Sequence, residues 1–316
     1  MRAIVTDNLT KVYKEVGKAS VKSLDGLNLT IEENEVYGLL GRNGAGKTTT
    51  IKLLVGLLKP TAGGATVFGK NMRCPEARRL IGYLPEQPYF YEYLTPRETI
   101  EFYGKLQSLS SDERKHQWDK LSELLDLRDI ANQRLKGFSK GMRQRIGFAV
   151  ALVGDPPLLI LDEPMSGLDP IGRRMIRDLI MRCRDEKKTL FFSSHVMSDV
   201  EQICDRVSIL VKGKLTHQGR IDELLGKKTK AVEIVVAGLG EDLRSALRQA
   251  AHGHRRLDEQ DLFTFADEEQ ANEAVQRIQQ QGGRLVQFQP IRESLEDFFL
   301  RQQESGESGQ HEGEAV

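Results

Sequence analysis

A glycine-rich stretch between two apolar segments constrains the fold of this chain more than any other feature. It reads Gly41-Arg42-Asn43-Gly44-Ala45-Gly46-Lys47-Thr48, which fits the pattern G-x-x-x-x-G-K-[ST] at every fixed position. Residues 35–40 predict a short buried strand before it, and residues 49–58 predict a helix after it, with no breaker until Pro60. In this context, backbone N–H groups at a helix N-terminus can wrap closely around phosphates. We therefore expect an α/β core that binds a nucleoside triphosphate.

Two side chains of this phosphate loop carry chemistry of their own. Lys47 can neutralise the β- and γ-phosphates, and Thr48 can ligate Mg²⁺. A chance glycine loop before a helix is the alternative, but sequence and context both argue against it. The residues expected to contact nucleotide here are Gly41, Arg42, Asn43, Gly44, Ala45, Gly46, Lys47, Thr48 and Thr49.

Composition excludes several other classes of protein. Lysine and arginine together number 46, as do aspartate and glutamate, so the net charge gives no case for a nucleic-acid partner. Basic residues scattered along 134–145 are better explained by a solvated helix. Three cysteines without a C-x-x-C pair indicate thiols in a reducing compartment. There is no apolar run of signal-peptide or membrane-spanning length, so any membrane role is expected to come through a partner.

The chain length of 316 residues favours one large and one small domain. Over residues 1–225, strands that alternate with helices predict a parallel sheet, with residues 158–161 and 189–194 as central strands buried on both faces. Residues 21–31 predict a strand–turn–strand unit interrupted at Asp25-Gly26. Residues 89–155 predict an inserted helical subdomain, with helix starts at Thr95-Pro96 and Ser110-Ser111.

The composition changes after Gly226. Residues 226–300 follow the order β-α-β-β-α-β, which predicts a small ferredoxin-like α+β domain. Residues 301–316 are mostly Gly, Glu, Ser and Gln, and we expect this tail to be disordered because it lacks apolar surface to bury.

A second constellation lies at the end of the apolar run 158–161, where Asp162-Glu163-Pro164 follows. A strand-end carboxylate at Asp162 is placed to hold Mg²⁺ through water, and Glu163 is placed to polarise the water that attacks the γ-phosphate. A turn with two solvated acids is the alternative, and the upstream phosphate loop argues against it.

Further elements, in the order expected of one family, resemble the ATP-binding cassette (ABC) ATPases over residues 3–225. By this resemblance, Tyr13 stacks on adenine, Gln87 touches Mg²⁺ and senses the γ-phosphate, and His195 contacts the γ-phosphate. Residues 138–142 resemble the signature motif, and Ser166-Gly167-Leu168-Asp169 resembles the loop after the catalytic carboxylate. The resemblance thus adds Gln87, Lys47 and His195 to Glu163 as catalytic residues, and Asp169 to the nucleotide-binding set.

The signature motif departs from the usual L-S-G-G-Q, since the chain has Phe138-Ser139-Lys140-Gly141-Met142. The two residues that contact phosphate in the family remain: Ser139 through its hydroxyl and Gly141 through its backbone. The variant resembles the motif of ABC-2-type exporters, and Lys140 adds charge near the nucleotide.

The resemblance implies an ATPase subunit in which the signature motif of one cassette binds the ATP held by another. One complete set of motifs predicts a homodimer, with a heterodimer left open. A separate transmembrane permease would hold the pair on the cytoplasmic face of a bacterial membrane, and the C-terminal domain resembles an accessory domain for dimer contacts or regulation. The exposed-looking aromatics 89–93 would serve a partner or the subdomain core.

Three rival classes remain to be compared with the transporter hypothesis. The first is a soluble ABC ATPase that acts in translation or on DNA, although the chain has neither two cassettes nor a long coiled coil. The second is an ATP-switched binding module without turnover, which intact Glu163 and His195 disfavour. The third is a GTPase, which the absence of an N-K-x-D element disfavours.

Overall fold

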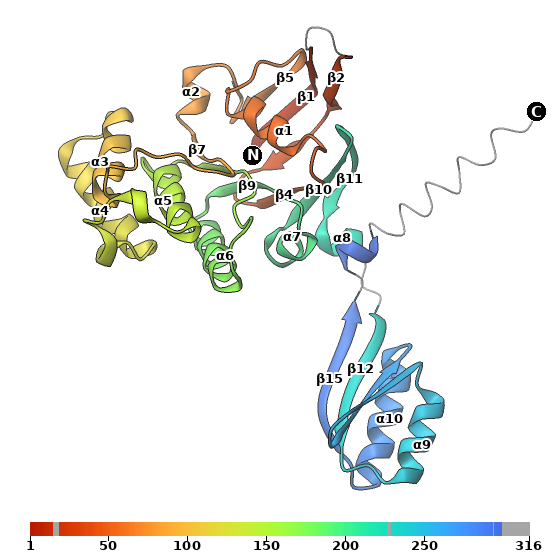
Figure 1. The fold of residues 1–316 in the computed structure, drawn as a ribbon. Helices are drawn as coiled ribbons and strands as arrows, with labels where there is room; N and C mark the ends of the chain where they lie inside the picture. Colours follow the sequence, from red (N-terminus) through yellow and green to blue (C-terminus); the bar gives the residue numbers. More distant parts are fainter. Residues whose placement is uncertain (15–18, 226–228, 293, 299–316) are drawn as a thin grey trace, which may run out of the picture. The chain divides into compact units, whose positions relative to one another are not determined.

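The computed structural model describes residues 1–14, 19–225, 229–292 and 294–298. The chain divides into two units, Met1–Ile221 and Asp222–Val316 (Figure 1). The tail predicted over 301–316, like the end of the last predicted helix, lies outside the described residues.

The central sheet of the first unit has the order β11-β10-β4-β9-β8-β7. Its parallel strands are β4 (Val36–Leu40), β7 (Ile81–Leu84), β8 (Leu158–Leu161), β9 (Thr189–Ser194) and β10 (Arg206–Val211). Every residue of β4, β8 and β9 is buried, as predicted for these central strands. The sequence prediction omitted β11 (Lys214–Arg220), an antiparallel edge strand whose residues are at least partly exposed.

Helix α1 (Lys47–Leu54) follows β4 and ends earlier than predicted. Gly56 has a φ of +77°, a left-handed conformation that glycine adopts without strain. The Gly56 N–H donates to the Leu53 carbonyl, and the Leu57 N–H donates to the Lys52 carbonyl. This Schellman motif stops the helix, so the prediction that it continued to residue 58 was wrong.

A second, five-stranded sheet contains β1 (Arg2–Tyr13), β2 (Val21–Leu27), β3 (Thr30–Glu32), β5 (Ala62–Val67) and β6 (Lys70–Asn71). The predicted turn at Asp25-Gly26 was wrong. Strand β2 continues through it to Leu27, and both β2 and β3 pair antiparallel with β1. Gly26 has a φ of +61° and lies where the register shifts, so it supports an irregularity within a strand.

The inserted helices are α3 (Pro96–Leu106), α4 (Ser111–Leu124) and α5 (Lys140–Leu152), with short 3₁₀ turns at Arg128–Ile130 and Leu135–Gly137. The Thr95 and Ser110 side chains close capping boxes with Glu98 and Glu113, as their spacing predicts. The remaining helices of this unit are α2 (Pro75–Arg78), α6 (Pro170–Asp185) and α7 (Met197–Ile203), and α8 (Ile221–Leu225) begins at its last residue.

The second unit contains β12 (Thr229–Ala237), α9 (Glu241–Ala250), β13 (Gly253–Leu257), β14 (Gln260–Phe265), α10 (Glu268–Gln280) and β15 (Arg284–Arg292). Its antiparallel strands have the order β13-β14-β12-β15, and both helices lie on one face of the sheet (Figure 1). This is the predicted ferredoxin-like arrangement, with Phe263 and Phe265 fully packed in its core.

A buried carboxylate, Asp261, joins the elements of this second unit. The Arg244 Nε donates to Asp261 at 3.0 Å, and His254 Nε2 lies 2.8 Å from its other oxygen. Burial raises the pKa of Asp261, but the hydrogen bonds from His254 and Arg244 outweigh it and leave that pKa below its ordinary value.

Candidate functional site

The phosphate loop joins β4 to α1, as the sequence predicts, and its glycines cannot be replaced freely. Gly46 has a φ of +110° and caps α1. A Cβ on Gly46 would lie 2.5 Å from the Ser23 carbonyl oxygen, and one on Gly41 would lie 2.6 Å from the Leu210 carbonyl oxygen. The loop therefore needs glycine for both its backbone conformation and its close packing.

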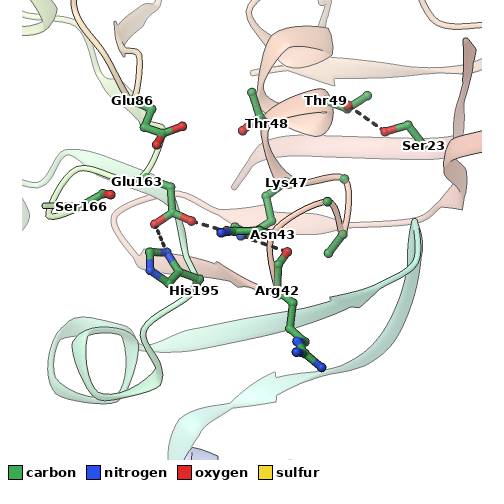
Figure 2. Close-up of a pocket in the computed structure, with 13 residues that line it drawn as sticks. Ser23, Arg42, Asn43, Lys47, Thr48, Thr49, Glu86, Glu163, Ser166 and His195 are labelled. Carbon is green, nitrogen blue, oxygen red and sulfur yellow. Dashed lines mark hydrogen bonds and ion pairs between the residues drawn. The ribbon is translucent and has the colours of Figure 1, made fainter.

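A pocket of about 500 Å³ opens over this loop (Figure 2). The predicted residues that line it are Arg42, Asn43, Gly44, Ala45, Gly46, Lys47, Thr48, Thr49, Glu163 and His195. Two further lining residues, Ser23 and Glu86, were not predicted, and a third, Ser166, belongs to the predicted 166–169 loop but had no role assigned to its side chain. Ser23 shares a 2.9 Å hydrogen bond with Thr49, a contact between β2 and α1 that no local sequence signal reveals.

Lys47 lies at the centre of a network of buried charges. Its ammonium donates to the Gly41 carbonyl at 2.6 Å and lies 3.1 Å from Glu163 Oε1. Both side chains are more than nine-tenths buried. Because a charge this buried needs a partner, the ion pair fixes the cation at the point where the loop meets the strand-end carboxylate.

Glu163 binds the two other groups that the sequence placed beside the γ-phosphate. Its Oε2 lies 2.8 Å from His195 Nδ1, while its Oε1 faces Lys47 (Figure 2). Glu163 has a φ of +48°, an uncommon conformation for a residue other than glycine. Strain of this kind persists where the surroundings hold it, and it concentrates at functional sites.

Asp162 is surrounded by hydroxyl donors. Its Oδ1 accepts hydrogen bonds from Thr48 at 3.2 Å and from Ser193 at 2.7 Å. The Ser193 hydroxyl also accepts from the Glu163 N–H at 2.9 Å, so it links the two acids. Burial raises the pKa of Asp162 above its ordinary value, although the hydrogen bonds from Ser193 and Thr48 oppose that rise.

The donor set at Thr48 and Asp162 suits Mg²⁺. Hydroxyl and carboxylate oxygens are the ligands this hard cation prefers, and it commonly takes only one or two protein ligands together with phosphate oxygens and water. Elsewhere, across 1–14, 19–225, 229–292 and 294–298, no cluster of three or more His, Cys, Asp or Glu side chains could hold a metal.

Of the predicted residues, Gly41 and Asp162 are buried and do not line this pocket, and Gln87 and Tyr13 lie away from it. Gln87 is exposed and lines a neighbouring pocket with Tyr89 and Phe138, while the preceding residue, Glu86, lines the pocket over the loop. Tyr13 ends β1 with its side chain 38% exposed. The roles assigned to Gln87 and Tyr13 remain predictions.

Three other predicted residues form helix N-termini outside this pocket. Ser139 caps α5 and accepts from the Met142 N–H at 3.3 Å, and Gly141 lies in the first turn of that helix. Asp169 caps α6 and accepts from the Gly172 N–H at 2.7 Å. Their hydrogen bonds account for the local structure, and their predicted contacts with nucleotide remain predictions.

The strand–glycine-loop–helix unit, together with a carboxylate pair at the end of a parallel strand, defines a P-loop nucleoside-triphosphatase core. The model for the ABC transporter family matches residues 24–166. An uncharacterised ABC transporter ATP-binding protein of Synechocystis is 37% identical over 310 residues, which cover 95% of this chain and 84% of that protein.

The bacitracin transport ATP-binding protein BcrA of Bacillus licheniformis is 42% identical over 233 residues, covering 73% of this chain and 74% of that protein. A solved dimeric ATP-binding cassette in a post-hydrolysis state, bound to ADP and Pi, superposes with a TM-score of 0.64 at 26% identity, covering 69% of this chain and 98% of that one. This chain therefore belongs to the ABC transporter ATP-binding proteins, the class of ATPase that its motifs predict. No helix that the structure describes is both long enough and apolar enough to cross a membrane.

Proposed function

We propose that this protein binds and hydrolyses ATP as the nucleotide-binding subunit of a bacterial ABC exporter, and drives a separate transmembrane permease. The observation that carries the proposal is the buried position of Glu163 between Lys47 and His195 beside the phosphate loop. There, Glu163 can polarise the attacking water, Lys47 can neutralise phosphate charge, and His195 can orient the γ-phosphate.

Thr48 and Asp162 would hold the Mg²⁺ that accompanies ATP, with Gln87 reaching it from the adjoining loop. When bound, the ion neutralises charge on the β- and γ-phosphates. The raised pKa of Asp162 means that protons compete with the cation at higher pH than they would for an ordinary aspartate. Tyr13 would stack on the adenine ring.

Two copies of the chain would enclose two ATP molecules. Ser139 and Gly141 do not line the pocket over their own phosphate loop, which supports a role toward the nucleotide of a second copy. Asp169 would join that interface from the start of α6. The dimeric state of the similar solved cassette favours the same arrangement.

Transport is favoured over a soluble role by the likeness to a bacitracin transport protein and by the ABC-2-type signature variant. The permease would hold the protein on the cytoplasmic face of the membrane. Tyr89, Tyr91 and Tyr93 are 85%, 49% and 65% exposed and offer aromatic surface to such a partner. The C-terminal domain predicted over residues 226–300 would serve dimer contacts or regulation.

The first test is Glu163→Gln, with the exposed Glu123→Gln as the matched control. We expect ATP hydrolysis to fall by roughly 10²–10⁴-fold, the scale of a lost general base, and the variant to accumulate as an ATP-bound dimer in light-scattering measurements. Hydrolysis at the wild-type rate by Glu163→Gln would refute the assigned role.

The second test is copurification of the tagged protein from detergent-extracted native membranes. A polytopic membrane protein in stoichiometric amount supports the transporter assignment. Ribosomes, DNA or no membrane protein would favour the soluble-ATPase alternative instead.

A further inference from the structure

Two helices begin beside the carboxylate–histidine pair, and each continues a loop that bears a site residue. Helix α6 starts directly after the loop Ser166–Asp169, and α7 starts two residues after His195. The positions of these two loops therefore depend on how the first turns of α6 and α7 are held together.

An ion pair joins those first turns. Arg173 of α6 donates through Nη2 to Asp199 Oδ2 of α7 at 2.6 Å. Asp199 is 3% exposed and Glu163 is 7% exposed, so the Asp199 carboxylate is the more buried of the two. A buried charge-assisted hydrogen bond of this length strongly favours one relative position of its partners.

The ion pair and the site share a small cavity. Its volume is about 110 Å³, and Arg173 and Asp199 line it together with Glu163 and His195. The His195 side chain is itself 42% exposed, and it contacts Glu163 through a 2.8 Å interaction of Nδ1. Much of the ring is therefore free of surrounding protein, and its place depends on the backbone that enters α7.

We propose that the Arg173–Asp199 ion pair is a positioning device that holds His195 against Glu163. The inference rests on the proposed ATPase function. It also couples contact with a second copy to the position of His195, because Arg173 lies four residues after Asp169, in the helix that continues the 166–169 loop. When a second copy contacts that loop, a shift of the first turn of α6 moves Asp199, and with it the start of α7 and His195. Hydrolysis thus responds to dimer contact through two residues that touch neither nucleotide nor metal.

The test replaces both charges at once with Arg173→Met/Asp199→Leu, because a single substitution would leave a buried charge unpaired. We expect kcat for ATP hydrolysis to fall roughly 10–100-fold, the usual effect of losing a group that orients a catalytic residue. KM for ATP should change less than about twofold, since the ATP-binding loop is untouched. Arg173→Lys keeps a cation and should recover part of the lost kcat.

A matched control lies one turn further along the same two helices. Arg177 of α6 contacts Gln202 of α7, but neither residue lines the cavity. Arg177→Met/Gln202→Leu should leave kcat within about twofold of the wild-type value. A fall in kcat confined to the Arg173→Met/Asp199→Leu variant would therefore distinguish positioning of His195 from a general loss of α6–α7 packing.

Each outcome is decisive. Unchanged kcat in the Arg173→Met/Asp199→Leu variant, an equal loss in the control variant, or a loss that appears in KM alone would overturn the positioning role. Wild-type protein that hydrolyses no ATP, or Glu163→Gln that retains activity, would instead refute the proposed function. Circular dichroism and thermal melting of every variant verify that the compared proteins are folded.

Discussion

Ser193 is the residue whose loss should reveal most about how the two acids are held. It is fully buried in β9, where its hydroxyl donates to Asp162 and accepts from the Glu163 N–H. Ser193→Ala removes a hydrogen bond to a charged group, worth about 1.5–3 kcal/mol, and leaves a buried N–H unpaired, at about 1–3 kcal/mol. Allowing for overlap between the two effects, we expect a loss of about 2–4 kcal/mol in the free energy of unfolding.

The loss should depend on pH with a sign fixed by Asp162. Burial already raises the pKa of Asp162, and Ser193 opposes that rise, so the variant should have a still higher pKa at this carboxyl. A raised folded-state pKa contributes stability at low pH that is lost as the pH rises through the folded pKa. The destabilisation by Ser193→Ala should therefore be larger at neutral pH than at acidic pH. As the pH is lowered, Mg²⁺-dependent hydrolysis should begin to fall at a higher pH in the variant than in the wild type.

Urea denaturation of the full chain, followed through the single tryptophan, Trp118 in α4, measures the stability change. Ser208→Ala is the control, because Ser208 is equally buried but bonds the neutral Tyr37 hydroxyl at 2.6 Å. It should cost about 0.5–1.5 kcal/mol and leave the pH profile of hydrolysis unchanged. A stability loss for Ser193→Ala no greater than for Ser208→Ala, together with an unshifted pH profile, would refute the reasoning.

Three further substitutions test other parts of the argument. Asp162→Asn keeps an oxygen acceptor for its two hydroxyl donors but removes a buried charge. We therefore expect a urea midpoint at neutral pH at least as high as that of the wild type, together with loss of Mg²⁺-dependent hydrolysis. A clear drop in the urea midpoint would contradict this expectation. Gly46→Ala combines a φ of +110° with a Cβ 2.5 Å from a backbone oxygen, so it should lose at least about 2 kcal/mol of stability and most nucleotide binding. Gly44→Ala has open space around its Cβ and should lose less stability. Equal losses in the two variants would argue against the packing explanation. Arg244→Ala removes a hydrogen bond that, together with the one from His254, lowers the pKa of Asp261 against the effect of burial. The stability lost in this variant is present in the wild type above the unfolded-state pKa of aspartate and fades as the pH falls through the lowered folded-state pKa. The difference in stability from the wild type should therefore shrink in acid, and a difference independent of pH would exclude this linkage.

Local sequence predicted most of the elements because their signals are short-range. A continuous apolar run predicted β8, and the apolar centre of residues 189–194 predicted β9. Serine and threonine caps predicted the starts of α3 and α4, and the β-α-β-β-α-β order predicted the ferredoxin-like unit. The end of α1 was missed although its signal, Gly56, is local, and two other errors fell where long-range contacts decide. Strand β2 continues through Asp25-Gly26 because it pairs with β1. Strand β11 forms because it pairs with the otherwise free edge of β10.

The site shows the same division. Fixed motif spacing named Lys47, Glu163 and His195 in advance, since each lies on or next to the loop that defines it. Glu86, rather than Gln87, lines the pocket beside them, because neighbouring residues of one loop point in different directions and sequence spacing alone does not reveal which.

The sequence by itself determined the family, the phosphate loop and the identity of the acids, because a glycine loop, a lysine and a strand-end carboxylate carry their chemistry wherever the fold brings them. Tertiary structure alone decided that Ser193 bridges the two acids and that Arg173 meets Asp199 across 26 residues of chain. Serine and arginine are common residues, so their presence in a sequence does not reveal a role. The roles of Ser193 and Arg173 come from burial beside particular partners, which depends on the packing of strands and helices that are distant along the chain.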